Sequence, residues 1–169
     1  MYKLLALLIM FSILAACSNP ANRDPSSPYY DIPITTKISL LKTVTIPAHT
    51  AHIYFQGAVI TSPKDTNQYH PHCRFDVRMK SETAQTINPN TYTLRRVSSN
   101  YDVVSLPDLR YYYTEFMLYS AKDTNVLSLK CGQWSSYDDM STYLTIKQIQ
   151  ETLGDYMKIK LPASSINIK

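Results

Sequence analysis

Glycine is scarce in this 169-residue sequence, which contains only Gly57, Gly132 and Gly154. Phosphate-binding loops and dinucleotide-binding turns need several closely spaced glycines, because only glycine lets the backbone approach a phosphate closely. Three scattered glycines exclude both motifs, and the Gly-x-Ser-x-Gly turn of the α/β-hydrolases is also absent. Adjacent carboxylates occur only at Asp138-Asp139, where a turn is a better explanation than acid–base catalysis. We therefore expect a protein that is not an enzyme.

Long apolar runs are confined to the N-terminus. Residues 4–16 form a predominantly apolar run of 13 residues that follows the positive charge of Lys3. A helix needs about 20 apolar residues to cross a bilayer, so this run is too short to span one. Its length, charge and small terminal residues are typical of a secretory signal peptide. We therefore assign residues 1–16 to a signal peptide, and no later run is long enough to span a membrane.

The signal region ends in a motif with a covalent consequence. The four residues Leu14-Ala15-Ala16-Cys17 resemble the lipobox of bacterial lipoproteins. That resemblance implies cleavage before Cys17, diacylation of its thiol and attachment to a lipid bilayer through the acyl chains. Ser18, rather than Asp, follows the cysteine, which by the sorting rule of the family implies the outer membrane. The alternative is an ordinary signal peptide cut after Ala16, which would leave Cys17 as a free secreted thiol.

The rest of the chain divides into a linker and one domain. Residues 17–36 are rich in Pro, Ser and Asn and lack hydrophobic periodicity, which predicts a lipidated N-terminus followed by a flexible tether. Residues 37–169 suit a single β-rich domain. Charges of both signs are interspersed, with a net charge of +4 that includes Lys3. This pattern indicates solvated surfaces and no nucleic-acid partner.

Alternation of apolar and polar residues predicts a mainly β fold, an antiparallel β-sandwich or partly open barrel of about seven strands. Strands are expected at 37–46, 51–61, 72–80, 91–98, 101–105, 110–120 and 126–132. One C-terminal helix is also expected. Thr145 and Gln148 have the spacing of a capping box, and Gly154 can end the helix.

Two segments of the chain are similar to each other. SPKDTNQYHPHC at 62–73 aligns without gaps on SAKDTNVLSLKC at 120–131, with a cysteine six residues after the shared asparagine in each. One interpretation is two related hairpins, each with a Lys-Asp-Thr-Asn turn and a return strand that carries the cysteine. Asp and Asn also favour turns wherever they occur, so turn chemistry alone could produce the match. Both interpretations stay open from the sequence.

The number of cysteines bears on whether QYHPHC is a metal site. Cys17 belongs to the predicted anchor, which leaves Cys73 and Cys131 in an exported, oxidising compartment. Strand alternation points both thiols to the apolar side of their strands. We therefore predict a Cys73–Cys131 disulfide and no cofactor. The alternative is a weak metal site at His70 and His72, which lack the ligand spacing of strong zinc motifs.

The strand predicted at 72–80 has one apolar face and one charged face. The apolar face carries Cys73, Phe75, Val77 and Met79, and the charged face carries Arg74, Asp76, Arg78 and Lys80. We expect the first set to point into the core and the second set to point into solvent, because successive side chains of a strand alternate between its faces.

The most aromatic segment is RYYYTEFMLY at 110–119. Its alternation places apolar side chains on both faces, so either both faces are covered or one forms an exposed patch. As a patch, Arg110, Tyr111, Tyr113 and Tyr119 would form a binding surface for a glycan or a partner protein. Structural packing across neighbouring strands is the other interpretation, and it is favoured on general grounds.

The order of short motifs in the mature chain is similar to that of small Gram-negative lipoproteins with no established activity. These motifs are IPAHTAHIYFQ, YHPHCRFDV, INPNTYTL and IKQIQETLG. The resemblance implies a localisation and nothing about mechanism. We expect an outer-membrane-anchored lipoprotein that faces the periplasm and has a non-enzymatic binding or scaffolding role, with an envelope protein or glycan as its partner.

Two alternative functions stay open from the sequence. An envelope enzyme or inhibitor could assemble a site from distant residues such as His49, His52, His70 and His72. A surface-exposed carbohydrate or protein binder could use residues 110–119. A compact cluster of histidines with a carboxylate in a cleft would favour the first, and a flat tyrosine-rich surface would favour binding.

The anchor prediction is tested by metabolic labelling with palmitate. Wild-type protein should incorporate the label and fractionate with membranes, because its acyl chains would be bound to Cys17. The Cys17→Ala variant should lose the label completely. Labelling that persists in Cys17→Ala would refute the anchor.

Overall fold

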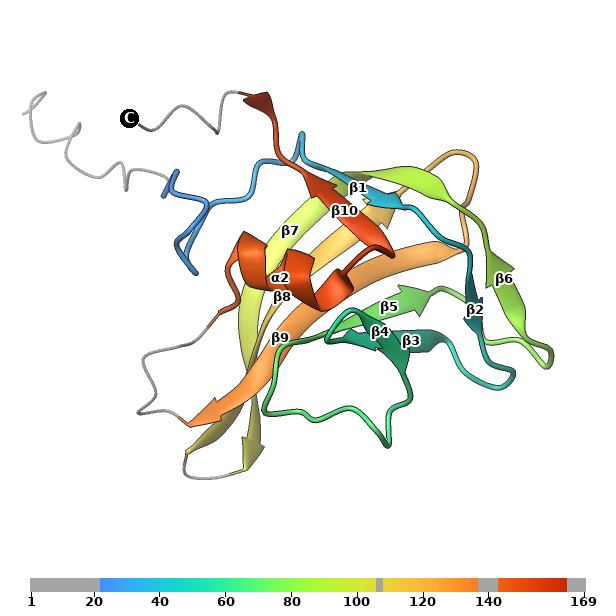
Figure 1. The fold of residues 1–169 in the computed structure, drawn as a ribbon, viewed down its shortest axis with the longest axis horizontal. Coiled ribbons are helices and arrows are strands. Elements are labelled where there is room, and N and C mark those ends of the chain that lie inside the picture. Colours follow the sequence, from blue (N-terminus) through green and yellow to red (C-terminus); the bar gives the residue numbers. More distant parts are fainter. Residues whose placement is uncertain (1–21, 106–107, 137–142, 164–169) are drawn as a thin grey trace, which may run out of the picture.

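The computed structural model describes residues 22–105, 108–136 and 143–163, and it shows a curled antiparallel sheet with one helix (Figure 1). The elements in chain order are β1 (Lys37–Leu40), β2 (Val44–Ile46), β3 (His52–Gln56), β4 (Val59–Thr61), β5 (His72–Val77), β6 (Gln85–Ile87), β7 (Asn90–Ser105), β8 (Leu109–Tyr119), β9 (Val126–Ser136), α2 (Ile146–Leu153) and β10 (Met157–Lys160). Eight strands form the main sheet in the order β10-β1-β7-β8-β9-β5-β3-β4, and β2 pairs with β6 in a small second sheet. The prediction of a mainly β antiparallel fold with one C-terminal helix is confirmed, and of the two expected alternatives the sheet forms the partly open barrel rather than the sandwich.

The hydrophobic core lies on the inner side of the curled sheet, where α2 covers it. Helix α2 buries Ile149 and Leu153 and contacts β3, β5 and β10. The largest fully buried side chains come from strands on both halves of the sheet and include Tyr92, Phe55, Phe75 and Phe116. Because these strands curl around one helix, their inner faces meet in a single apolar cluster.

Helix α2 begins and ends where its sequence predicts. The Thr145 hydroxyl accepts from the Gln148 backbone N–H at 3.2 Å, and the Gln148 side chain accepts from the Thr145 N–H at 2.9 Å. This reciprocal capping box satisfies two N–H groups that the helix itself leaves unpaired. Gly154 ends the helix with a φ of 54° and packs directly on Ala58, in the turn between β3 and β4. A side chain at 154 would therefore be strained and would overlap Ala58.

The predicted disulfide is confirmed. Cys73 on β5 and Cys131 on β9 face each other in the register of the two strands, with Cα atoms 4.0 Å apart and an S–S distance of 2.09 Å. Both cysteines are fully buried on the inner side. The bond therefore joins two central strands that lie 58 residues apart in the chain.

Four of the predicted strand boundaries are corrected by the structure. The segment 37–46 is divided between β1 and β2, which belong to different sheets. The segment 51–61 folds back as the β3–β4 hairpin, because Gly57 and Ala58 both adopt positive φ. The segments 91–98 and 101–105 are one continuous strand, β7. Strands β6 and β10 were not expected, since each is only three or four residues long.

The two similar segments do not form two similar hairpins. Strand β9 returns beside β8, so residues 120–125 turn a true hairpin. Residues 62–71 instead connect β4 to β5, and β5 pairs with β3 rather than with β4. The hairpin interpretation is therefore wrong for the first segment. Turn chemistry explains the match, because in both segments an Asp or Ser side chain accepts from the backbone two or three residues later.

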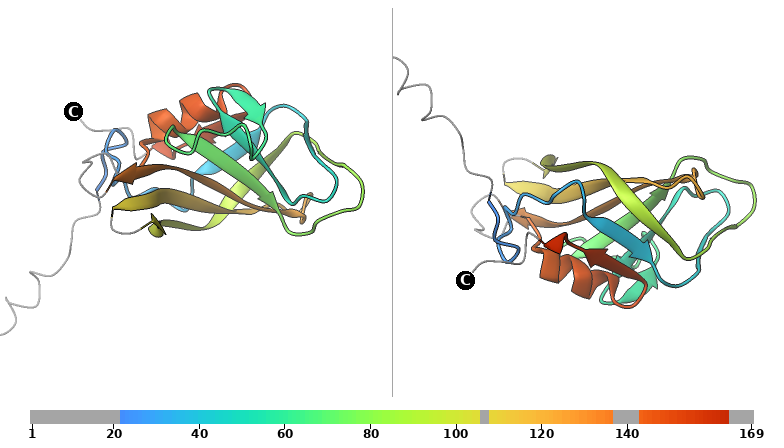
Figure 2. Two further views of the ribbon diagram at one scale, coloured as in Figure 1. Left: turned by 90° about the horizontal axis from the view of Figure 1, so that it is seen from below. Right: turned by 90° about the horizontal axis from the view of Figure 1, so that it is seen from above.

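The predicted tether is described from Asn22 onward, and there it is turned rather than extended. The Asp31 N–H donates to the Asn22 carbonyl at 2.9 Å, and the Asn22 side chain donates to the Ser27 hydroxyl at 2.9 Å. Tyr30 is buried against the domain. This segment lies at one end of the long axis, and the loops beside β2 and β6 lie at the other end (Figure 2). No helix among the described residues is long and apolar enough to cross a bilayer.

We predict that removing the disulfide lowers the free energy of unfolding. In the double variant Cys73→Ala/Cys131→Ala, the unfolded chain regains the freedom of a loop of 58 residues, which corresponds to about 4 kcal/mol. Urea unfolding at pH 7 measures the change. Reduced wild-type protein is the matched control and should unfold at the same urea concentration as the double variant. A variant as stable as the oxidised protein would contradict the prediction.

Candidate functional site

The tyrosine-rich strand β8 has both of its faces covered by other side chains. Tyr112, Phe116 and Leu118 point into the core, as the alternation predicts. Tyr111 and Tyr113 lie on the outer side of the sheet, together with His72 on β5 and Tyr54 on β3. We call these four outer-side residues the outer aromatic cluster.

The rings of the outer aromatic cluster form a row across the sheet, each in contact with the next. The His72 and Tyr111 rings are nearly parallel, with centroids 5.5 Å apart, and Tyr111 stacks on Tyr113 at 5.1 Å. Tyr54 lies 6.1 Å from His72 on the other side. The Lys130 ammonium sits 4.1 Å from the centroid of Tyr113. The ring faces therefore contact one another, which makes the cluster a second, small core on the outer side of the sheet.

Gly132 allows Tyr111 to reach His72 across an intervening strand. The order of strands is β8, β9, β5, so the Tyr111 ring must pass over β9 at the position of Gly132. A methyl group at 132 would overlap the Tyr112 carbonyl and would lie 2.9 Å from the Tyr111 ring. The missing side chain is therefore the space in which this ring lies.

Charged groups beside the cluster are paired. The Arg74 guanidinium lies 2.9 Å from the Asp76 carboxylate, and the Ser128 hydroxyl donates to Asp76 at 3.3 Å. Asp76 is only 8% exposed, contrary to the expectation that it points into solvent. Met79 is 70% exposed, contrary to the expectation that it points into the core. Strand β5 ends at Val77, so its alternation does not extend to Met79.

Burial favours the uncharged forms of His72 and Tyr111. Burial is the largest effect on His72 and lowers its pKa. The hydrogen bond from its ring Nδ1 to the His70 carbonyl, at 2.9 Å, raises the pKa, and the nearby Arg74 charge lowers it. Burial likewise raises the pKa of Tyr111. In their neutral forms the two rings can stack and form hydrogen bonds.

The predicted binding surface of Arg110, Tyr111, Tyr113 and Tyr119 is divided by the structure. Tyr111 and Tyr113 belong to the outer aromatic cluster. Arg110 lies over the Tyr101 ring at 4.7 Å, and Tyr119 lies under Arg95 at 4.3 Å. Each tyrosine thus has a neighbour on its ring, and the four residues do not form one flat platform. Packing across strands accounts for them.

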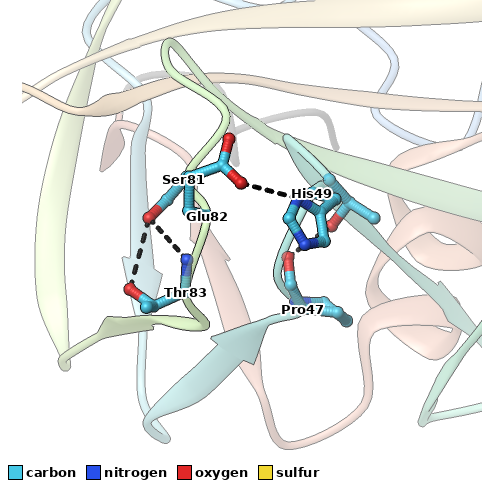
Figure 3. Close-up of polar contacts among 6 residues, drawn as sticks. Pro47, His49, Ser81, Glu82 and Thr83 are labelled. Atoms are coloured by element: carbon cyan, nitrogen blue, oxygen red, sulfur yellow. Dashed lines mark hydrogen bonds and ion pairs between the residues drawn. The ribbon is translucent and has the colours of Figure 1, made fainter.

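The four histidines do not gather around one point, although His52 and His72 both contact the Tyr54 ring. His49 lies in an exposed loop with its Nδ1 3.3 Å from the Glu82 carboxylate (Figure 3). The nearby Ser81 hydroxyl contacts Thr83 rather than His49 (Figure 3). Ser81 and His49 therefore do not form a nucleophile–base pair. His52 stacks edge-on with Tyr54 at 5.4 Å. A hydrolase-like site is thus not assembled from them.

The metal alternative at His70 and His72 finds no support in the geometry. Cys73 is oxidised, so it provides no thiolate ligand. His72 is 1% exposed with its Nδ1 directed at a carbonyl, whereas His70 is exposed. Within the described ranges no group of three or more His, Cys, Asp or Glu side chains could hold a metal ion. Cys17 and Asp138-Asp139 lie outside the described residues.

An open polar pocket of about 510 Å³ lies at one end of the sheet. Four side-chain amides line it, from Gln85, Asn88, Asn90 and Asn125. The rest of the lining comes from β6, the β6–β7 connection and the β8–β9 turn: Thr86, Ile87, Pro89, Lys122 and Asp123. We call it the amide pocket. A second hollow of about 470 Å³ shares Gln85 and Asn125 with it.

Hydrogen bonds hold the walls of the amide pocket in place. The Asn125 side chain donates to the Gln85 side chain at 2.8 Å, and the Asn90 side chain donates to the Ser120 hydroxyl at 2.9 Å. Beneath them the Tyr92 hydroxyl donates to Asp123 at 3.0 Å. Within the described part of the chain, the Asn88 amide and the Lys122 ammonium make no hydrogen bond or ion pair, so both are available to a ligand.

The amide pocket was not predicted from the sequence. Most of its residues belong to the segments INPN and AKDTN, which read as ordinary turns, and Gln85 and Thr86 come from the short strand β6, which was not expected. They meet because β7 begins and β8 ends at the same end of the sheet, which places the two connections side by side. Two amide-rich turns around adjacent antiparallel strands are the signal that could have revealed the pocket.

Comparison with known proteins identifies no relatives: no family model matches the chain, no curated protein is similar in sequence, and no solved structure matches the fold.

We predict that acid destabilises the protein through His72. Its folded pKa is below the ordinary value of about 6.5, so the unfolded chain takes up a proton first as the pH falls. The free energy of unfolding should therefore fall from pH 7.5 to pH 5.5, and the fall should be smaller in His72→Gln. Urea unfolding at both pH values measures this.

The matched control for that experiment is His70→Gln, which replaces an exposed histidine two residues away. It should retain the full pH dependence of the wild type. If His72→Gln and His70→Gln show the same pH dependence, the burial of a neutral His72 is not its cause.

Proposed function

We propose that this protein is a lipid-anchored binding module of the bacterial outer membrane that faces the periplasm and has no catalytic activity. The lipobox-like residues 14–17 and the preceding apolar run support the anchor. The paired charges and stacked rings of the outer side support a role other than catalysis. The ligand we propose is an envelope glycan, bound in the amide pocket.

The position of the amide pocket is the observation that carries this proposal. The N-terminal segment that follows the proposed acyl anchor lies at one end of the long axis, and β6 with its loops lies at the other (Figure 2). Gln85 of β6 and Asn90 of β7 line the pocket at that far end. A domain attached at its N-terminal end would present this pocket away from the bilayer.

The chemistry of the amide pocket suits a neutral, hydroxyl-rich ligand. Asn and Gln side chains each offer two donors and an acceptor, which match the hydroxyl and acetamido groups of a glycan. Lys122 and Asp123 contribute one charge of each sign, so the pocket has no strong preference for an ion. Its open shape fits an extended chain rather than a small enclosed molecule.

Binding of soluble peptidoglycan fragments tests the proposal. Asn88→Ala and Lys122→Ala should each weaken binding about five- to tenfold, because each removes one hydrogen-bonding group from the ligand. Isothermal titration calorimetry with the purified full-length protein measures the affinity.

The matched control is Lys158→Ala, which removes an exposed lysine of β10 outside the pocket. It should bind the fragments as the wild type does. Equal affinities of Lys122→Ala and Lys158→Ala would place the binding elsewhere on the molecule. An absence of binding by the wild type would rule out a peptidoglycan ligand.

A further inference from the structure

Strand β7 has a long edge that no other strand covers. Strand β8 pairs with β7 over Thr93–Ser105, whereas β1 pairs with the opposite edge of β7 only over Asn90–Thr93. From Leu94 to Val104 the edge of β7 opposite β8 pairs with no strand in the described part of the chain. Such an edge presents backbone N–H and C=O groups that can pair with another strand.

The middle of this edge is regular and partly apolar. Register shifts occur between Leu94 and Arg96 and again between Val103 and Ser105, so residues 96–103 form an uninterrupted stretch between two bulges. Tyr101 is 49% exposed and Val103 is 53% exposed within it. We call residues 96–103 the β7 edge. Bulges at both ends restrict strand pairing to this stretch.

We propose that the β7 edge pairs with the same edge of a second copy of this chain, antiparallel, about a two-fold axis at Ser99. In such a pair Ser99 faces Ser99 of the other copy, and a residue a given number of positions before Ser99 faces the residue the same number of positions after it. Arg96 then lies opposite Asp102, and the pair occurs twice because of the symmetry. Val97 lies opposite Tyr101, so apolar side chains also meet.

The faces of the sheet agree with this register. Arg96 pairs with Met117, and Asp102 pairs with Tyr111, both of which lie on the outer side. Opposite residues of an antiparallel pair point to the same face, so Arg96 and Asp102 side chains would be neighbours there. Both are exposed, and neither forms an ion pair with any residue the structure describes.

Charge selects this register over its neighbours. Moving the axis to Asn100 would place Arg96 opposite Val104 and Asp102 opposite Ser98. Moving it to Ser98 would place Arg96 opposite Asn100 and Asp102 opposite Leu94. Only the axis at Ser99 compensates both charges while it keeps each side chain on its own face. This self-complementarity argues for a second copy rather than an unrelated strand.

The symmetry also leaves the amide pockets accessible. Strand β7 begins at Asn90, which lines the pocket, and its other end lies on the side of the N-terminal segment (Figure 2). Because the two copies of β7 would run antiparallel, the N-terminal ends of the two copies lie on opposite sides of the axis, each beside the partner. Asn90 lies nine residues from Ser99 and Ser105 lies six, so the two pockets stay at the outer ends of the pair.

Cysteine crosslinking of the full-length protein in cells tests the dimer. In the Ser99→Cys variant the two new cysteines would face each other across the axis, at the Cα separation of directly opposite residues, about 4.5 to 5.5 Å, which a disulfide can span. A non-reducing gel should show a dimer that disappears on reduction. In the control Val103→Cys, the two cysteines would lie about 25 Å apart and should not crosslink.

Charge reversal provides an independent measurement with the purified protein in detergent. Arg96→Asp should weaken self-association about tenfold, because it creates two like-charge contacts. The double variant Arg96→Asp/Asp102→Arg should restore wild-type self-association in sedimentation equilibrium. Circular dichroism checks that each variant is folded.

Three outcomes would overturn the proposal. The first is the absence of a Ser99→Cys dimer, or one as abundant as that of Val103→Cys. The second is a Ser99→Cys crosslink to a different protein, which would assign the edge to another partner. The third is a double charge variant that associates no better than Arg96→Asp. None of these results depends on glycan binding, so the two proposals fail separately.

Discussion

The fold depends on the pairing of β5 with β9 at the centre of the main sheet. This pair connects the half formed by β10, β1, β7, β8 and β9 to the half formed by β5, β3 and β4. Cys73 and Cys131 join it covalently on the inner side, where both are fully buried. On the outer side of the same two strands, Gly132 provides the space in which Tyr111 stacks on His72. The central joint is therefore packed on both faces, and neither half can move without disturbing the other.

The two sides of the sheet perform different tasks with similar residue types. The inner side buries aliphatic and phenylalanine side chains under α2, which is the usual source of stability for a domain of this size. The outer side is covered by stacked rings and the Arg74–Asp76 ion pair rather than by another element. Covering a face with its own side chains leaves the ends and the edge of the sheet as the places for binding.

Those places are distributed along the length of the molecule. The amide pocket lies where β7 begins, the β7 edge lies along its middle, and the N-terminal segment lies near its far end. The long strand β7 thus relates all three features, because its register with β8 determines where each one falls. The proposed anchor, glycan site and dimer contact therefore lie on separate surfaces.

The sequence by itself determined the features that depend on local pattern or on counting. Alternation predicted the curled antiparallel sheet, the spacing of Thr145, Gln148 and Gly154 predicted α2, and the number of cysteines predicted the Cys73–Cys131 bond. The continuity of β7 was missed because residues 98–100 are polar and resemble a turn, whereas their pairing with β8 continues the strand through them.

Only the tertiary structure decided where the remaining chemistry lies. The burial of His72 and Asp76 depends on residues of β8 and β9, which are far away in the chain, and no local pattern reports them. The division of the tyrosines among several contacts, and the contact of both His52 and His72 with Tyr54, follow from strand order in the same way. The amide pocket forms from two turns that strand pairing brings together. Long-range pairing is a property of the whole sheet, so a sequence that specifies each strand does not reveal which strands are neighbours.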